Sequence, residues 1–292
     1  MSASTRLTRV FESAPVIEFD NKSKFIFFSD CHRGINNWAD DFADNEILAL
    51  HALNHYYRSD YTYIEIGDGD ELWENYNFNE IREAHSQVFE VMCEFHQQNR
   101  LYLIWGNHDI VRKNPRYVKK THYSFYDEST KAELPLFEGI HFYEGLILEH
   151  SVNQQKIFVV HGHQADLFGD HLWLLERFFV RHVWRHLQIL GVKDPTSAAM
   201  NSRKRVKVEK RIIEWVKSKN QIIIAGHTHL PRFPISKNDP LYFNDGSCVH
   251  PRQIIGIEIE NSEIKLIKWS LKPNPDGVLF VTKDILAGPR KL

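Results

Sequence analysis

The sequence predicts an α/β fold in which a central pair of β-sheets lies between outer helices. Three observations lead to this prediction. Strands and helices alternate over residues 24–105, the second half of the chain is rich in strands, and five predicted strands end in acidic, amide or imidazole side chains. The chain has 292 residues, of which 42% are hydrophobic and 25% charged, so it can bury a sizeable core. We expect a single domain over residues 1–292.

The first half of the chain reads as a β-α-β-α-β series. The apolar run 24–29 predicts a buried strand, and residues 40–58 carry apolar side chains at helical spacing. A β-rich run at 61–66, a helix from about 80 to 98 and a strand at 101–105 follow. Parallel strands joined in this way have right-handed crossovers, so we expect three parallel strands in one sheet.

The second half contains mainly predicted strands. Two β-rich runs, 139–150 and 155–160, flank a short polar stretch and predict a hairpin. A further strand is predicted at 221–225, and the tail from residue 272 onward is expected to be a surface loop because it contains proline, asparagine and glycine. The remaining strands, at 241–244, 253–260 and 263–270, are expected to form a meander.

Five short polar motifs follow predicted strands. In open α/β sheets the loops beyond the carboxyl ends of strands converge on one crevice, so these motifs are expected to meet. Carboxylate and imidazole donors together suit Mn, Fe, Zn or Ni rather than Ca or Mg. Seven or more such donors can hold two metal ions side by side, which is the machinery of phosphoester hydrolysis. The motifs are Asp30-Cys31-His32, Gly67-Asp68, Gly106-Asn107-His108-Asp109, His161-Gly162-His163 and Gly226-His227-Thr228-His229.

Any one of these motifs alone is weak evidence for a metal site. A single histidine is more often a polar core or surface residue than a ligand, and an isolated D-x-H or H-x-H pair has roughly one chance in ten of being a functional site. Five such motifs in one chain, each at the end of a predicted strand, are not expected by chance. The set as a whole predicts a two-metal site.

The segment 164–219 interrupts the strand pattern and is predicted to be helical. Residues 171–190 contain twelve apolar residues, with Arg177, Arg181 and Arg185 in one stripe at intervals of four. A second, basic helix is expected over about 203–211. Because both flanking strands end at the predicted site, the insertion is expected beside its mouth as a helical lid. The alternative is that its apolar side simply packs on the sheets.

Composition limits the compartment and the partners. The 36 basic and 38 acidic residues give a net charge of -2, so we expect no dedicated binding of nucleic acid. The three cysteines are scattered without C-x-x-C spacing, which fits a reducing cytosol. The N-terminal residues lack the apolar core of a secretory signal. We expect a cytoplasmic protein, with at most a peripheral membrane or lipid contact through the 171–190 helix.

With these motifs the sequence resembles the calcineurin-like metallophosphoesterase superfamily. The pattern of that superfamily is D-x-H, G-D, G-N-H-[DE], a later H, and G-H-x-H, and all five blocks occur between residues 30 and 229. The resemblance implies a four-layer α/β/β/α sandwich of two mixed sheets flanked by helices. It also implies hydrolysis of a phosphoester or pyrophosphate bond by metal-bound hydroxide.

The resemblance implies a specific ligand set for two divalent transition-metal ions. We expect Mn²⁺ first, with Fe, Zn or Ni as alternatives. Asp68 is expected to bridge the two ions. The first ion is implied to bind Asp30, His32, Asp68 and His229, and the second Asp68, Asn107, His161 and His227.

His108 and Glu71 are the implied catalytic pair. By resemblance His108 faces the phosphate, stabilises the transition state and protonates the leaving oxygen. A carboxylate three residues after the bridging aspartate orients this histidine in the protein-phosphatase branch, and here that position is Glu71 rather than aspartate. Cys31 is expected to be a small packed side chain. Asp70, Asp109 and His163 are expected to support the site rather than to bind metal, and the alternative for His163 is contact with the substrate or the second metal.

Within the superfamily the chain most resembles the UDP-2,3-diacylglucosamine pyrophosphatase-like branch. Residues 67–73, Gly-Asp-Gly-Asp-Glu-Leu-Trp, are similar to its G-D-x-x-D-x-W motif, and that branch also has a basic helical lid between the fourth and fifth motifs. Two positions differ, since His163 and His108 stand where that branch has aspartate and arginine. The expected substrate is therefore a phosphorylated small molecule or a nucleotide-type compound.

Other functions stay open on the sequence alone. A protein Ser/Thr phosphatase is one, although Trp73 and Glu74 replace the arginine and glycine of its G-D-x-x-D-R-G motif, and a nuclease is another. A non-catalytic binding scaffold on the same fold belongs to a different class. Such scaffolds usually lose metal ligands, whereas here every block is present.

Overall fold

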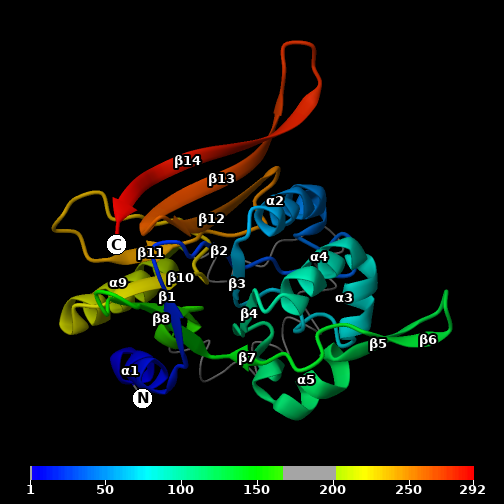
Figure 1. The fold of residues 1–292 in the computed structure, drawn as a ribbon, viewed down its shortest axis with the longest axis horizontal. Helices are drawn as coiled ribbons and strands as arrows, with labels where there is room; N and C mark the ends of the chain where they lie inside the picture. Colours follow the sequence, from blue (N-terminus) through cyan, green and yellow to red (C-terminus); the bar gives the residue numbers. More distant parts are fainter. Residues whose placement is uncertain (1, 167–201) are drawn as a thin grey trace.

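The computed structural model describes residues 2–166 and 202–292. In this part of the chain two mixed β-sheets lie face to face with helices on their outer sides (Figure 1). The predicted helix over 171–190 and its arginine stripe lie outside the described residues. No helix in the described part is long and apolar enough to cross a membrane.

The larger sheet has seven strands and carries the first three metal motifs. Its order is β14-β13-β12-β2-β3-β4-β7. The strands β2, β3, β4 and β7 are parallel, as predicted for the first three, and β12 to β14 are antiparallel. The bounds are β2 Phe25–Phe28, β3 Thr62–Ile66, β4 Leu101–Ile104, β7 Phe142–Tyr143, β12 Gln253–Glu260, β13 Glu263–Pro273 and β14 Leu279–Lys291.

Helices α2 (Glu46–Arg58) and α4 (Ser86–Gln97) cover the outer face of this sheet. On α2 the buried residues Leu48, Ala52 and Tyr56 recur every four positions and form the apolar stripe. The helix predicted from about 80 to 98 is two helices, because α3 (Phe78–Ala84) ends at His85 before α4 begins. The other elements on this side are η1 Ala43–Asn45, η2 Ile110–Lys113, α5 Pro115–His122, β5 Ser124–Asp127 and β6 Ala132–Pro135.

The smaller sheet has five strands and carries the last two metal motifs. Its order is β1-β8-β9-β10-β11. Helices α1 (Ala3–Ser13) and α9 (Ser202–Lys219) cover its outer face, where Trp215 of α9 and Leu7 of α1 are buried against Phe158 and its neighbours. Its strands are β1 Val16–Phe19, β8 Gly145–His150, β9 Lys156–Val160, β10 Ile222–Ala225 and β11 Tyr242–Asn244, and η3 (His163–Ala165) follows β9.

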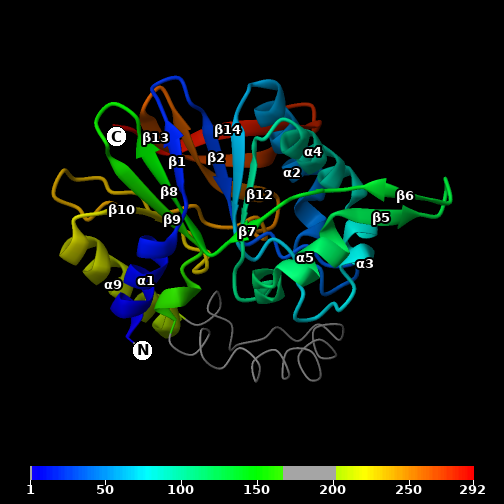
Figure 2. The same ribbon diagram turned by 60° about the horizontal axis from the view of Figure 1, so that its bottom comes forward.

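Three apolar cores separate the four layers. The middle core lies between the sheets and contains Ile64 and Phe27 from the larger sheet and Val159 and Ile224 from the smaller one. Figure 2 shows α1 and α9 on one side of the paired sheets and α2, α3 and α4 on the other. The predicted four-layer α/β/β/α sandwich is confirmed. The described end of the insertion, α9, packs on the smaller sheet as its outer helix.

Three sequence-based predictions need correction. The tail after residue 272 is not a surface loop, because β14 (Leu279–Lys291) pairs along β13 and is the edge strand of the larger sheet. The strand predicted at 241–244 is present as β11 but pairs with β10 in the smaller sheet, so it is not part of the meander. The run 139–150 is divided between β7 and β8, which belong to different sheets, although the hairpin of β8 with β9 is confirmed.

Candidate active site

Backbone hydrogen bonds join the loop after β2 to the loop after β3, and the loop after β9 to the loop after β10. The amide N–H of Asp30 donates to the carbonyl of Gly67 (3.1 Å), and that of His32 donates to Asp68 (2.9 Å). On the smaller sheet the N–H of Gly226 donates to the carbonyl of His161 (3.0 Å). The ladders of both sheets therefore continue past the strand ends into the polar motifs, which fixes the positions of the side chains.

Most of the predicted ligands have left-handed backbone conformations. Non-glycine residues rarely adopt positive φ, since their Cβ atoms then approach the following carbonyl at a cost of about 1–2 kcal/mol each. Such strain commonly gathers at functional sites, where the surrounding structure holds it in place. The φ values are 50° for Asp30, 49° for His32, 49° for Asp68, 68° for His227 and 53° for His229.

Asp30, His32 and His229 form a first cluster. Their ligand atoms lie within 4.8 Å of one another. The Nε2 atom of His229 is 3.0 Å from Oδ1 of Asp30, and Nε2 of His32 is 3.8 Å from the same oxygen. The other carboxylate oxygen of Asp30 accepts the backbone N–H of His227 (2.8 Å) and the hydroxyl of Ser29. Oδ1 is thus left to face the two imidazoles.

Asp68, His161 and His227 form a second cluster. The Nδ1 atom of His161 donates to the carbonyl of Ile66 (2.7 Å), so Nε2, which lies 3.2 Å from Oδ2 of Asp68, is the nitrogen available to a cation. The same oxygen of Asp68 is 4.0 Å from Nε2 of His32 in the first cluster. Asp68 therefore stands between the two clusters.

Asn107 lies beside the second cluster on the loop after β4. The next residue, His108, donates its backbone N–H to Oδ1 of Asp68 (2.8 Å). The amide Oδ1 of Asn107 is buried and has no hydrogen-bond partner among the described residues. The structure thus brings all seven predicted metal-ligating residues to one place, and their binding of metal stays a prediction.

The donor atoms of this region fit divalent cations. Buried polar atoms nearly always have hydrogen-bond partners, so a group of buried atoms without them indicates a missing ligand. Carboxylate oxygens and imidazole nitrogens in clusters of this size suit transition-metal ions. The unpartnered buried atoms in the described part of the site include Asp30 Oδ1, His32 Nε2, Asn107 Oδ1, His161 Nε2 and His227 Nε2.

The electrostatics of the clusters favour positive charge. Burial opposes ionisation of Asp30, but the imidazoles of His229 and His161 hold the pKa of Asp30 below its ordinary value. Burial also disfavours charged imidazoles, yet Glu71 and Asp68 raise the pKa of His32 to about 9. Asp68 and Asp30 raise the pKa of His161 to about 9 against the same effect of burial. Protons on these imidazoles occupy the place that cations would take.

Glu71 contacts two imidazoles with one oxygen. Its Oε2 lies 2.7 Å from Nδ1 of His108 and 2.9 Å from Nδ1 of His32. Burial alone would raise the pKa of Glu71, but His108 and His32 lower it to about 2. Despite burial, Glu71 and Asp68 raise the pKa of His108. The predicted contact between Glu71 and His108 is present, and the contact between Glu71 and His32 was not predicted.

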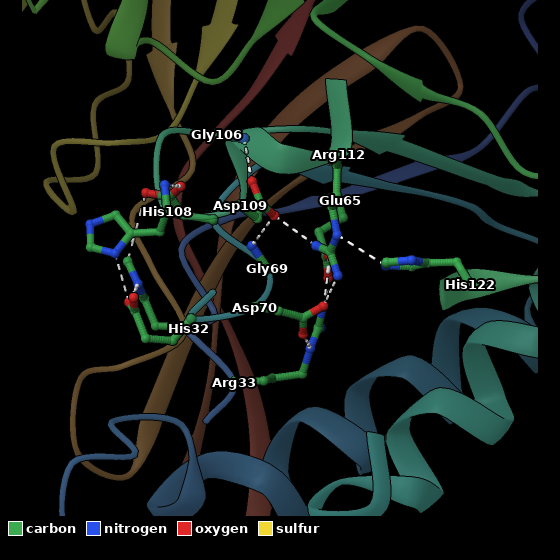
Figure 3. Close-up of polar contacts among 12 residues, drawn as sticks. His32, Arg33, Glu65, Gly69, Asp70, Gly106, His108, Asp109, Arg112 and His122 are labelled. Atoms are coloured by element: carbon green, nitrogen blue, oxygen red, sulfur yellow. Dashed lines mark hydrogen bonds and ion pairs between the residues drawn. The ribbon is translucent and has the colours of Figure 1, made fainter. Parts of the chain in front are cut away.

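A buried ionic network lies behind the site (Figure 3). Arg33 makes a two-pronged pair with Glu65 (2.7 and 2.8 Å) and also bonds Asp70. Arg112 bonds the other oxygen of Asp70 and donates to Asp109 (2.7 Å). All five side chains are at most 3% exposed. The network connects the loops after β2, β3 and β4 through charges that the core shields from water.

Asp109 connects this network to the metal motifs. Its Oδ1 accepts the backbone N–H of Gly106 (2.6 Å), and its Oδ2 accepts that of Gly69 (3.2 Å). Asp109 therefore joins the loop that carries Asp68 to the loop that carries Asn107. This agrees with the supporting role expected for Asp109.

Two further residues predicted near the site are placed as follows. Cys31 is 3% exposed and belongs to the apolar core, and a hydrogen bond with Cys248 together with burial raises the pKa of Cys31 well above its ordinary value. It is a packed side chain, as expected. His163 is fully buried, with its ring 5.4 Å from that of His161. Burial and the neighbouring imidazoles of His161 and His227 keep the pKa of His163 well below its ordinary value.

The sequence analysis missed Asp166 and the arginines of the network. Oδ2 of Asp166 lies 3.6 Å from Nε2 of His227 and 3.0 Å from Nζ of Lys204 on α9. Arg33 follows a ligand candidate directly, and Arg112 lies three residues after Asp109. Nothing in the sequence distinguishes such buried arginines from surface ones, because their partners are distant in the chain.

Comparison with known proteins identifies the family. A search of curated proteins found no match. The fold is similar to solved structures of Vps29 from Chaetomium thermophilum (7% identity, TM-score 0.38, covering 90% of this chain and 96% of that chain) and of a cold-active protein tyrosine phosphatase (16% identity, TM-score 0.42, covering 93% and 81%). The family model described as calcineurin-like phosphoesterase matches residues 23–231. Because this match covers well over half of the chain, the protein belongs to the calcineurin-like phosphoesterase family.

Proposed function

We propose that this protein is a dinuclear metal-dependent phosphohydrolase. The observation that carries the proposal is the convergence of Asp30, His32 and His229 in one cluster and of Asp68, His161 and His227 in a second, with Asp68 between them. Membership of the calcineurin-like phosphoesterase family supports divalent metal ions and a phosphorylated substrate in general. The number of ions and the bond cleaved are our inference.

The ligand assignment follows the two clusters. Asp30, His32, Asp68 and His229 would hold one ion, and Asp68, Asn107, His161 and His227 the other. Bound there, two divalent cations would polarise the phosphoryl oxygens and make water nucleophilic at neutral pH. We propose Mn²⁺ as the first choice, with Fe, Zn or Ni also compatible with these donors.

The residues beside the clusters would act on the leaving group. His108 is about one fifth exposed, so it can reach a substrate, and its Nδ1 is held at 2.7 Å by Glu71. Because Nδ1 lies against the carboxylate, Nε2 is the nitrogen that can give a proton to the leaving oxygen as the P–O bond breaks. Glu71 stabilises the positive charge that the imidazole carries before this transfer.

The test is the replacement of His108 by alanine. We expect kcat to fall by about 10²–10⁴ with metal content unchanged, since a positioned general acid contributes that much. Activity would be assayed with Mn²⁺ on p-nitrophenyl phosphate, its bis ester, cyclic nucleotides and UDP-sugars, and metal content by elemental analysis. A His108→Ala protein that has lost its metals, or that is fully active, contradicts the assigned role.

The same panel separates the alternative substrates. Preference for a UDP-sugar would support a pyrophosphatase of the UDP-sugar-lipid type, and preference for a phosphoprotein added to the panel would support a Ser/Thr phosphatase. A non-catalytic scaffold predicts no turnover of any compound. It also predicts fewer than about two metal equivalents per chain, because two-metal chemistry needs both ions.

A further inference from the structure

Trp73 lies flat against the imidazole of His108. The two ring centroids are 4.1 Å apart and the ring planes are inclined by 20°. Trp73 is 4% exposed, so its indole is a fixed part of the wall of the site. Its backbone N–H donates to Oε1 of Glu71 (3.3 Å). One loop after β3 thus supplies both the carboxylate at the edge of the His108 ring and the indole on its face.

These two contacts restrict different motions of the imidazole. The Glu71 contact fixes where Nδ1 lies, but the torsion between the ring and Cβ of histidine is broad, so one contact leaves the tilt of the ring variable. A flat aromatic partner on the ring face restricts that tilt, and its electron-rich face also attracts a charged imidazole. The direction in which Nε2 points is set only when both contacts are present.

We propose that Trp73 is a positioning residue for the general acid, because its indole aims Nε2 of His108 at the leaving oxygen. This inference rests on the proposed phosphohydrolase function. In the step concerned, water adds to phosphorus, the bond from phosphorus to the leaving oxygen breaks, and the proton on Nε2 passes to that oxygen. Tilting the ring away should slow this proton transfer and leave the metals in place, since the indole belongs to neither metal cluster.

Trp73 and Glu71 are expected to differ in their effects. Glu71 also contacts His32, a member of the first metal cluster, so replacing it disturbs metal binding and proton transfer together. The indole of Trp73 stacks on His108 itself. A replacement at position 73 that preserves the backbone should therefore act on proton transfer with the metals in place.

The experiment compares Trp73→Leu, Trp73→Phe and Trp269→Leu with the wild type. Trp269 on β13 is also 4% exposed but lies in the core under α2, so it controls for loss of a buried tryptophan. The substrates are p-nitrophenyl phosphate, whose leaving group needs little protonation, and phenyl phosphate, whose leaving group needs it. If the enzyme acts on diesters, the corresponding diesters are used.

We expect Trp73→Leu to lower kcat by at least about tenfold on the phenyl ester and by less than about threefold on the p-nitrophenyl ester, as for a misaligned general acid. KM and metal content should stay unchanged. Trp73→Phe keeps a stacked ring and should restore most of the rate on the phenyl ester. In Trp269→Leu the ratio of the two rates should equal that of the wild type. Equal losses on both esters, or loss of metal in Trp73→Leu, overturn the proposal.

A second measurement does not depend on turnover. Stacking of the indole shifts the carbon-bound protons of the His108 ring upfield in an NMR spectrum, and His108→Gln assigns these signals. We expect Trp73→Leu to remove the shift and broaden the signals as the ring becomes mobile, and Trp73→Phe to keep them sharp. Unchanged signals in Trp73→Leu overturn the positioning role. A wild type that hydrolyses no ester refutes the proposed function, while the spectra still decide whether Trp73 holds the ring.

Discussion

Gly106 shows how a single missing side chain shapes the site. A Cβ atom placed at position 106 would lie 2.2 Å from Oδ1 of Asp68 and 2.6 Å from its backbone nitrogen. The glycine therefore allows the loop after β4 to approach the central carboxylate closely enough for the N–H of His108 to bond it. Close approach of backbone is one of the few requirements that only glycine meets.

Replacing Gly106 by alanine is expected to abolish metal binding at neutral pH, since the methyl group must displace the Asp68 carboxylate. Elemental analysis after dialysis against Mn²⁺ measures this. Gly277→Ala in the β13–β14 turn is the control, because φ is +81° there but no atom lies within 4 Å of the new Cβ. It should cost about 1–2 kcal/mol through backbone strain and leave metal content unchanged. Full metal content in Gly106→Ala would contradict the assigned place of Asp68.

His122 is a histidine kept neutral by its surroundings. Its ring is fully buried and stacks on Phe78 at 3.9 Å. Its Nε2 accepts from Nε of Arg112 (3.1 Å), so that nitrogen has no proton to lose. Burial, together with the charge of Arg112, keeps the pKa of His122 well below its ordinary value. The imidazole fills a polar position in the ionic network without adding charge.

This neutral histidine should make stability depend on pH. Below about pH 6.5 the unfolded chain binds a proton at His122 and the folded chain does not, so stability is present above that pH and is lost as pH falls. The slope is at most about 1.4 kcal/mol per pH unit. His122→Gln keeps an acceptor for Arg112 and removes this dependence. Urea unfolding with chelator present at pH 7.5, 6.5 and 5.5 should show the wild type losing its advantage over the variant.

The control for this comparison is His141→Gln at an exposed position. This variant removes a histidine outside the network and shows what the loss of an exposed imidazole does by itself. If the difference between wild type and His122→Gln stays constant across the same pH range, folding does not keep His122 neutral and the assigned role in the network is wrong.

At the scale of elements, the structure shows where the sequence pattern was sufficient and where it was not. The strands β2, β3 and β4 were predictable because parallel strands are buried on both faces and read as short apolar runs. β14 could not be predicted in this way, because none of its residues is buried and apolar residues such as Leu279, Ile285 and Leu286 are exposed. Its pairing with β13 is set by the turn and by the backbone rather than by burial, and its outer end projects from the body (Figure 1).

The site itself was predictable only as a set of motifs. The ligand candidates form recognisable short motifs, such as Asp30 and His32 with a single residue between them. The residues that support these motifs could not be recognised from the sequence. Glu65, Asp70 and Arg112 resemble ordinary surface charges, and only the fold shows that they are buried. Their pairing joins three loops that are separated by more than thirty residues each.

Arg112 is expected to stabilise the loops as a group. Arg112→Met preserves most of the volume but leaves the carboxylates of Asp70 and Asp109 buried without their partner. Breaking such a pair costs about 3–5 kcal/mol. Lys272→Met is the matched control, since it breaks an ion pair with Asp284 in which both side chains are more than a third exposed, so that water screens the attraction and little stability should be lost. Urea unfolding compares the two, and equal losses would mean that the network contributes nothing beyond a surface pair.

At the scale of the whole molecule, the candidate site joins the two sheets. Asp30, His32 and Asp68 come from the larger sheet, whereas His161, His227 and His229 come from the smaller one. Each cluster contains residues from both sheets. The four-layer arrangement was predictable because the motif order resembles one superfamily, but the pairing of β11 with β10 was not, since a three-residue strand carries too little pattern to choose a sheet.

Because the ligand candidates come from both sheets, we expect metal binding to connect the sheets and to raise the free energy of unfolding of the whole fold. A ligand that binds only the folded state adds about 2.7 kcal/mol at a hundred times its dissociation constant. We expect Mn²⁺ to raise the free energy of unfolding by at least this amount in the wild type, and a chelator to reverse the effect. Asp68→Asn removes the carboxylate that stands between the clusters and should lose most of the gain.

The matched control is Asp276→Asn in the exposed β13–β14 turn, which should keep the full gain. Unfolding followed by circular dichroism at several Mn²⁺ concentrations gives the dependence. Titration calorimetry gives the number of ions bound, expected to be two in the wild type. A gain of equal size in Asp68→Asn would place the stabilising ion away from the sheet interface, because Asp68 is the residue on which both clusters converge.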